Sequence, residues 1–195
     1  MGYPPLDRIA DLQQLIADFA KVRRAVPLAD ANAAENDVEH SYGLALTCWF
    51  LQSKIAPELD LSEILKYALA HDIVEVHAGD TYPFDTAAVA TKYQREMAAL
   101  VQLEHDWPDF TDLTDYARNY ADKFNEEARF VYAVDKLLPV IMIELANAKE
   151  IWDKKGLTLT IERSNKVTIL QSKIVAPYYK KLLAWLDERG NIPKY

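Results

Sequence analysis

The sequence contains little glycine, a single cysteine and no long hydrophobic run. Five glycines in 195 residues, with no clear alternation of apolar and polar residues, give few signals of strands. The lone Cys48 cannot form a disulfide within the chain, and its apolar neighbours predict a buried, inert thiol. No apolar run is long enough to span a bilayer, and the first residues lack the hydrophobic region of a signal peptide. We therefore expect a cytoplasmic protein that does not bind membranes.

Positive charge is also scarce. The chain has 22 Lys and Arg against 30 Asp and Glu, a net charge of −8. Such a surface repels nucleic-acid polymers, which excludes non-specific binding to them. A small phosphorylated substrate stays possible, because it needs only local positive charge at its site. The length suffices for a substantial core, and no linker is visible, so we expect one domain over residues 1–195.

Apolar residues recur at intervals of three and four, which predicts helices along the chain. A first helix begins at Leu6 and stops before Pro27, and a polar loop follows. Asn36 with Glu39 three residues later forms a capping-box pattern, predicting a second helix to about Ile55. The fold class we expect is all-α, a single-domain helical bundle whose motifs lie within about 20–150. The further helices are predicted over 61–76, 86–104, 113–123, 126–149 and 159–187.

The pair His71-Asp72 lies in the strongly apolar stretch LKYALAHDIVEV. A carboxylate buried there is costly unless a positive charge pairs with it. His40 and Asp135 fall on two other predicted helices, which a bundle can bring to one point. Two imidazoles and two carboxylates suit one divalent ion, with Mn²⁺, Co²⁺, Fe²⁺ or Zn²⁺ favoured over Mg²⁺. Such an ion can activate water for hydrolysis.

Two acids follow the pair. Glu75 comes three positions after Asp72 and shares its face on a helix, where it can position or deprotonate a water molecule. Asp80 follows Gly79 in a loop that returns to this helix end, and it can contact a sugar hydroxyl or protonate a leaving oxygen. The alternatives are a solvated helix residue for Glu75 and a turn-forming residue for Asp80.

Two arginines, Arg23 and Arg24, close the first predicted helix. A guanidinium near a metal suits a phosphate ester, because its fork matches two phosphate oxygens. An exposed arginine that interacts favourably with the helix dipole is the alternative for each.

Three runs, ENDVEHSYGLAL, ALAHDIVEVHAGD and VYAVDKLLP, resemble the HD-domain metal-dependent phosphohydrolases, most closely their bacterial 5′-deoxynucleotidase-like subgroup. The resemblance implies an all-helical fold, a homodimer and hydrolysis of nucleotide phosphate esters. It also implies Glu75 as the acid that orients water and Asp80 as a substrate or leaving-group contact. The metal ligands that it implies are His40, His71, Asp72 and Asp135.

The sequence departs from this subgroup before the first histidine. The subgroup has an arginine, a tryptophan and then a proline, whereas this chain has RRAVPL. Arg24 is the nearest match for the arginine, and no tryptophan follows it. Tyr82 and Phe84 in the loop after Gly79 can flank a base or simply pack.

Other readings stay open for single residues. Asp72 and Asp135 can be ion-pair partners of Lys136 or Lys66. Glu35 is interpreted as a loop or capping residue rather than a ligand. The histidines outside the set, His77 and His105, are interpreted as surface or structural residues. The four tryptophans are interpreted as core or interface anchors.

Three functions follow from these patterns. The first is a metal-dependent phosphomonoesterase acting on a small metabolite, with a nucleoside 5′-monophosphate as the leading substrate. The second keeps the chemistry with another nucleotide or phosphate class. The third is a metal-binding regulatory module without turnover, against which the presence of Glu75 argues.

Overall fold

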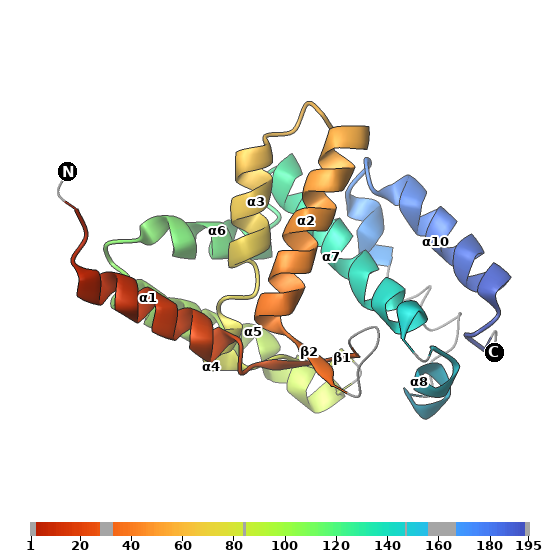
Figure 1. Cartoon of the computed structure of the whole chain (residues 1–195), viewed down its shortest axis with the longest axis horizontal. Coiled ribbons are helices and arrows are strands. Elements are labelled where there is room, and N and C mark those ends of the chain that lie inside the picture. The colour runs from red at the N-terminus through yellow and green to blue at the C-terminus, as the bar shows by residue number, and fades with distance from the viewer. Residues whose placement is uncertain (1–2, 28–32, 84, 147, 156–166, 194–195) are drawn as a thin grey trace.

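The computed structural model describes residues 3–27, 33–83, 85–146, 148–155 and 167–193. It is mostly helical, with one short pair of strands (Figure 1), which confirms the predicted all-α class. The strands are β1 (Arg23–Pro27) and β2 (Ala34–Asn36). The helices are α1 (Leu6–Phe19), α2 (Asp37–Ile55), α3 (Leu61–Ala70), α4 (Glu75–Ala78), α5 (Thr86–Asp106), α6 (Thr111–Ala121), α7 (Glu126–Leu145), α8 (Ala148–Lys155) and α10 (Ala176–Arg189), with the 3₁₀ helix η1 (Val167–Gln171).

Helix α7 lies at the centre of the main hydrophobic core. It packs against α2, α3, α6 and α10, and α2 and α3 run side by side next to it in Figure 1. Phe130, Val131 and Val134 of α7 are fully buried in this core together with Leu44 of α2 and Ile64 of α3. Removing these side chains from water stabilises the bundle and fixes the three helices that carry the predicted metal ligands.

The start of α2 is fixed by the predicted capping box. The Asn36 side chain accepts a hydrogen bond from the Glu39 backbone N–H, and the Glu39 carboxylate accepts one from the Asn36 N–H. Both bonds satisfy backbone donors that a helix leaves free at its first turn. The predicted boundaries of this helix are confirmed, and His40 therefore lies in its first turn.

The segment between α1 and α2 differs from the prediction. Helix α1 ends at Phe19, which is buried in a second core cluster with Leu15. The chain then becomes extended, and β1 pairs with β2 in an antiparallel hairpin. Arg23 and Arg24 therefore lie on a strand, so placing them at the end of the first helix was wrong. Pairing with the residues just before α2 overrides the local helical pattern. Of the predicted polar loop, residues 28–32 lie outside the described residues.

The predicted helix over 61–76 is divided into two. Helix α3 ends at Ala70, a turn covers 71–74, and α4 begins at Glu75. In this turn the Ile73 N–H bonds to the Ala70 carbonyl and the Glu75 N–H to the Asp72 carbonyl. These i to i−3 bonds are tighter than α-helical ones and allow the chain to change direction at the His-Asp pair.

The C-terminal half agrees with the prediction in part. The predicted helix over 126–149 ends earlier, at Leu145, and α8 follows separately; Pro139 lies inside α7. Much of the predicted 159–187 helix falls on 156–166, outside the described residues. Helix α10 begins with Pro177 in its first turn, where a missing N–H costs nothing. Within the described ranges, no helix combines the length and hydrophobicity needed to cross a membrane.

Candidate metal centre

The structure brings His40, His71 and Asp72 together at one point. One donor atom of each lies within 4.8 Å of the others, and the centroids of the two imidazole rings are 5.3 Å apart. His40 comes from the first turn of α2, and the other two come from the turn after α3. Both histidines are buried. Three donors from two segments at this spacing can bind one metal ion.

The hydrogen bonds of His71 leave one ring nitrogen for a ligand. Its Nδ1 lies 2.9 Å from the Ala68 carbonyl, which can only accept, so Nδ1 carries the proton. Nε2 is buried without a hydrogen-bond partner, although it lies 2.8 Å from Asp72 Oδ2. In the neutral ring both of these atoms are acceptors, and they repel each other unless a cation lies beside them. This arrangement fits a bound divalent ion.

Asp135 reaches the same point from α7. Its Oδ1 lies 2.9 Å from His40 Nε2, while its Oδ2 accepts hydrogen bonds from Tyr120 Oη at 2.9 Å and Lys136 Nζ at 2.5 Å. The group defined by the 4.8 Å spacing does not include Asp135. The predicted pairing with Lys136 is therefore present, and it also orients Asp135 so that its other oxygen faces His40.

Carboxylates surround His40 on both sides of its ring. Nε2 faces Asp135, and Nδ1 lies 3.4 Å from Glu35 Oε2. Burial acts to lower the pKa of His40, but the hydrogen bonds with Asp135 and Glu35 raise it to about 9. Interpreting Glu35 as a loop or capping residue was wrong, because it is buried and its Oε2 faces the site.

Asp37 is a site residue that the sequence reasoning missed. It is fully buried, its Oδ1 accepts a hydrogen bond from Arg24, and its Oδ2 has no hydrogen-bond partner. Burial and nearby Asp72 raise its pKa to about 6. Residues 35 and 37 flank Asn36 at the end of β2, and the two-residue period of a strand places both on one side. This two-residue period can be recognised in the sequence only once the hairpin is known.

Glu75 lies beside the predicted metal ligands, and one of its carboxylate oxygens has no hydrogen-bond partner. Its side chain is buried, Oε2 has no hydrogen-bond partner, and Oε1 lies 3.8 Å from Lys92 Nζ. Burial raises the pKa of its carboxyl to about 10, and the charges of Asp72, Asp37 and Asp80 add to this effect. The buried carboxylates around the two histidines thus carry more negative charge than the nearby arginine and lysine side chains neutralise. A bound divalent ion would balance this excess.

Of the two predicted phosphate ligands, Arg24 lies inside the cluster. Its Nη1 donates to Asp72 Oδ2 at 2.6 Å and to Asp37 Oδ1 at 3.1 Å, while its buried Nε has no hydrogen-bond partner. Arg23 is exposed, and its guanidinium donates to the Ala34 carbonyl across the hairpin. Neighbours on a strand point to opposite faces, which explains why the two arginines differ.

The loop that carries Asp80 is held by Arg95 of α5. Gly79 adopts φ +72°, a conformation that glycine tolerates, and the chain turns there. Arg95 donates to the Ala78 carbonyl before the turn and to Thr81 Oγ1, at 2.6 Å, after it. Asp80 lies between these two contacts, close enough to the cluster to affect the pKa of Glu75.

Replacing Arg95 with alanine should therefore disturb the Asp80 loop without removing a metal ligand. If Asp80 contacts the substrate, we expect kcat/KM for phosphate release to fall about tenfold, with unchanged metal content. Arg118→Ala is the matched control, because Arg118 pairs with Glu104 away from the loop. Equal kinetics in wild type and Arg95→Ala would contradict a positioning role.

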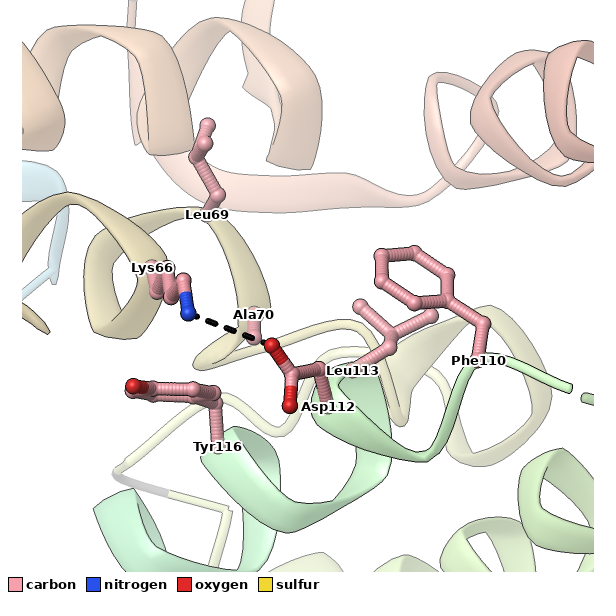
Figure 2. A pocket seen from close by; sticks show the side chains of 7 residues that line it. All are labelled: Lys66, Leu69, Ala70, Phe110, Asp112, Leu113 and Tyr116. Carbon is pink, nitrogen blue, oxygen red and sulfur yellow. Dashed lines mark hydrogen bonds and ion pairs between the residues drawn. The ribbon is translucent and has the colours of Figure 1, made fainter. Parts of the chain in front are cut away.

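Other candidates lie elsewhere. His77 is exposed, and among the described residues it belongs neither to the group of His40, His71 and Asp72 nor to a second group of close donors formed by Asp37, Asp72 and Glu75. A separate hollow of about 130 Å³ lies between α3 and α6. Its lining side chains, such as Leu69 and Phe110, are mostly apolar (Figure 2). Lys66 at this hollow pairs with Asp112 at 3.1 Å, so it is not the partner of the metal-site acids. The hollow contains none of the predicted site residues.

Comparisons with known proteins indicate the family of this chain. A family model for the HD domain matches residues 19–176. The 5′-deoxynucleotidase HDDC2 of Xenopus laevis is 30% identical over 104 residues, which cover 52% of this chain and 50% of that protein. The matched region thus spans about half of this curated relative.

Solved structures share the fold. A "predicted metal-dependent phosphohydrolase" from Magnetospirillum magnetotacticum is 26% identical, with a TM-score of 0.79 over 95% of this chain and 98% of that one. An HD-domain phosphohydrolase from Listeria innocua is 17% identical and has a similar fold, with a TM-score of 0.58 over 90% of each chain. Because the family model matches most of the chain, this protein belongs to the HD-domain family.

Proposed function

We propose that this protein is a metal-dependent phosphohydrolase that cleaves a phosphate monoester of a small metabolite, with a nucleoside 5′-monophosphate as the leading substrate. The observation that carries the proposal is the set of donors on His40, His71 and Asp72 within 4.8 Å, beside a partly buried arginine, Arg24, and a buried glutamate, Glu75. The Xenopus deoxynucleotidase and the Magnetospirillum phosphohydrolase support the same reaction class.

One divalent ion would be held by His40, His71, Asp72 and Asp135. When bound, it supplies Lewis acidity, which polarises a phosphoryl oxygen and lowers the pKa of water. Imidazole ligands favour Mn²⁺, Co²⁺, Fe²⁺ or Zn²⁺ over Mg²⁺. The Ala68 carbonyl fixes the His71 ring, and Tyr120 fixes Asp135, so these ligands are oriented before any ion binds.

Glu75 would orient the attacking water and, once the charge of a bound divalent ion lowers the pKa of its carboxyl, accept the proton of that water. Its free Oε2 is the acceptor that this role needs, and its place in α4 puts it next to Asp72. Asp80 would act from the loop after Gly79, contacting a sugar hydroxyl or giving a proton to the leaving oxygen. The roles of Glu75 and Asp80 are both part of this proposal.

Arg24 would bind the phosphate through the edge that its carboxylate partners leave free. Nearby Asp72 and Asp37 keep it charged but use only Nη1, whereas Nε makes no hydrogen bond and lies 3.8 Å from Glu35 Oε2. The same guanidinium can therefore bind the carboxylate of Asp72 and a phosphate group of the substrate at the same time.

Changing Arg24 to lysine keeps the charge but removes the planar fork. We expect kcat/KM to fall about 10- to 100-fold, with the larger part in KM. The same change at exposed Arg23 is the control and should leave both constants near wild type. Steady-state phosphate release measures both variants. Equal losses at both positions would show that surface charge, rather than a phosphate contact, is responsible.

A metal-dependence screen tests the function itself. Protein stripped of metal by a chelator should release no phosphate from nucleoside monophosphates, and Mn²⁺ or Co²⁺ should restore release. The same assay with nucleoside triphosphates and sugar phosphates separates the substrate classes. Full activity in the stripped protein would contradict the proposal, and no release from any substrate with any ion would favour a regulatory module.

A further inference from the structure

Lys92 of α5 is the cation that faces Glu75. Its Nζ lies 3.8 Å from Glu75 Oε1, and among the residues that the structure describes no other lysine or arginine forms an ion pair with this glutamate. The Glu75 side chain is 2% exposed, whereas that of Lys92 is 39% exposed. The ion pair therefore joins a buried acid at the candidate metal centre to a half-exposed side chain on a neighbouring helix.

Lys92 is itself held by a neighbour on α5. Glu96, which lies one turn further along the helix, pairs with Lys92 Nζ at 3.0 Å, as residues four apart on a helix surface can. Burial acts to lower the pKa of Lys92, but the charges of Glu96 and Glu75 raise it above its ordinary value. Lys92 therefore keeps its positive charge and stays within reach of Glu75.

Glu75 needs such support because its own helix is short. Helix α4 has only four residues, and a single turn is not stable alone; it packs against α5, which has 21. The last torsion of a glutamate side chain is broad and roughly two-fold, so the backbone does not determine where its two oxygens point. An ion pair at Oε1 removes this freedom, and Oε2 is left buried without a hydrogen-bond partner.

We propose that Lys92 is a positioning residue, which holds Glu75 by Oε1 so that Oε2 is directed at the water that attacks the phosphate. This inference rests on the proposed function, because it needs Glu75 to act on that water. Arg95 lies three positions after Lys92 and therefore on the same side of α5, where it holds the loop that carries Asp80. One side of this long helix thus supports both of the acids that would act on the substrate.

Replacing Lys92 with methionine tests the positioning role. Methionine keeps most of the apolar stem but has no charge, so Glu75 loses its anchor. In metal-loaded protein we expect kcat for phosphate release to fall about 10- to 100-fold, with KM within about twofold of wild type. Lys92→Arg keeps a cation at this position and should bring kcat back to within about fivefold of wild type. A thermal melt checks that both variants fold.

Lys66→Met is the matched control for Lys92→Met. Lys66 is also a half-exposed lysine on a helix and pairs with an acid, Asp112, but it does so at the hollow in Figure 2. We expect this control to keep the kcat and KM of wild type. Equal losses in the two variants would show a general effect of charge and overturn the positioning role. A rise in KM with wild-type kcat in Lys92→Met would also overturn it, because Lys92 would then contact the substrate.

A double variant tests whether Lys92 acts through Glu75. The amide in Glu75→Gln has no charge to pair with Lys92, so adding Lys92→Met should lower kcat by less than about a further twofold. Losses that multiply in full would show that the two residues act independently, which overturns the inference. Wild-type turnover in Glu75→Gln would refute the proposed role of Glu75 and this inference with it. Wild-type kcat in Lys92→Met beside a large loss in Glu75→Gln would refute the positioning role alone.

Discussion

Replacing Asp72 with alanine should lower kcat/KM for phosphate release at least about 10³-fold. Asp72 Oδ2 lies 2.8 Å from His71 Nε2 and 2.6 Å from the Arg24 guanidinium, so its loss would remove a proposed metal ligand together with a partner of the proposed phosphate-binding arginine. We also expect the purified variant to hold much less metal than wild type. Steady-state kinetics and elemental analysis of the same preparation measure both effects.

The control for this change is Asp112→Ala. Asp112 is an exposed acid that pairs with Lys66 beside the Figure 2 hollow, so its loss should affect neither activity nor metal content. Arg24 keeps its bond to Asp37 when Asp72 is absent, and the fold should therefore survive, as a thermal melt can show. A folded Asp72→Ala variant with wild-type turnover would contradict the assigned metal centre.

Replacing Glu75 with glutamine should separate water activation from metal binding. The amide keeps the size of the side chain but cannot accept a proton, so we expect kcat to fall about 10²- to 10⁴-fold. KM and metal content should change little, because Glu75 is not one of the four assigned ligands. Single-turnover kinetics on metal-loaded protein tests whether the chemical step is the one that slows.

Glu96→Gln is the matched control for Glu75→Gln. Glu96 lies 3.0 Å from Lys92, the same lysine that approaches Glu75, so this change alters the charge near the site without touching the proposed base. We expect the control to lose less than about tenfold in kcat. Intact turnover in Glu75→Gln would assign proton transfer to another group, and equal losses in both variants would indicate a general electrostatic effect.

The sequence predicted those parts of the site that local patterns determine. The capping box at Asn36 indicated where α2 begins and hence where His40 lies. The apolar run around His71 indicated a buried pair, of which His71 is buried and Asp72 is partly exposed. Helical periodicity placed Asp135 on a core helix. Each of these inferences needed only residues within a few turns of one another, because caps and amphipathic faces are local properties.

Other parts of the site depend on contacts that the sequence does not reveal. The hairpin carries Arg24 and brings Glu35 and Asp37 into the cluster, but its two strands, β1 and β2, are short, so no alternation of apolar and polar residues was long enough to predict them. The break after Ala70 depends on how α4 packs against α1 and α5. Lys92 and Arg95 were missed for the same reason. The spacing of apolar residues on α5 predicts a helix, but it does not say which other element this helix packs against.

The most direct test of the account is a crystal structure of the protein grown with Mn²⁺, with anomalous scattering recorded to locate the ion. We expect one strong peak about 2.0–2.3 Å from His40 Nε2, His71 Nε2 and oxygens of Asp72 and Asp135. Glu75 should lie beside the ion without binding it. A map with no peak among these four side chains, or an ion bound at a different part of the chain, would contradict the central claim.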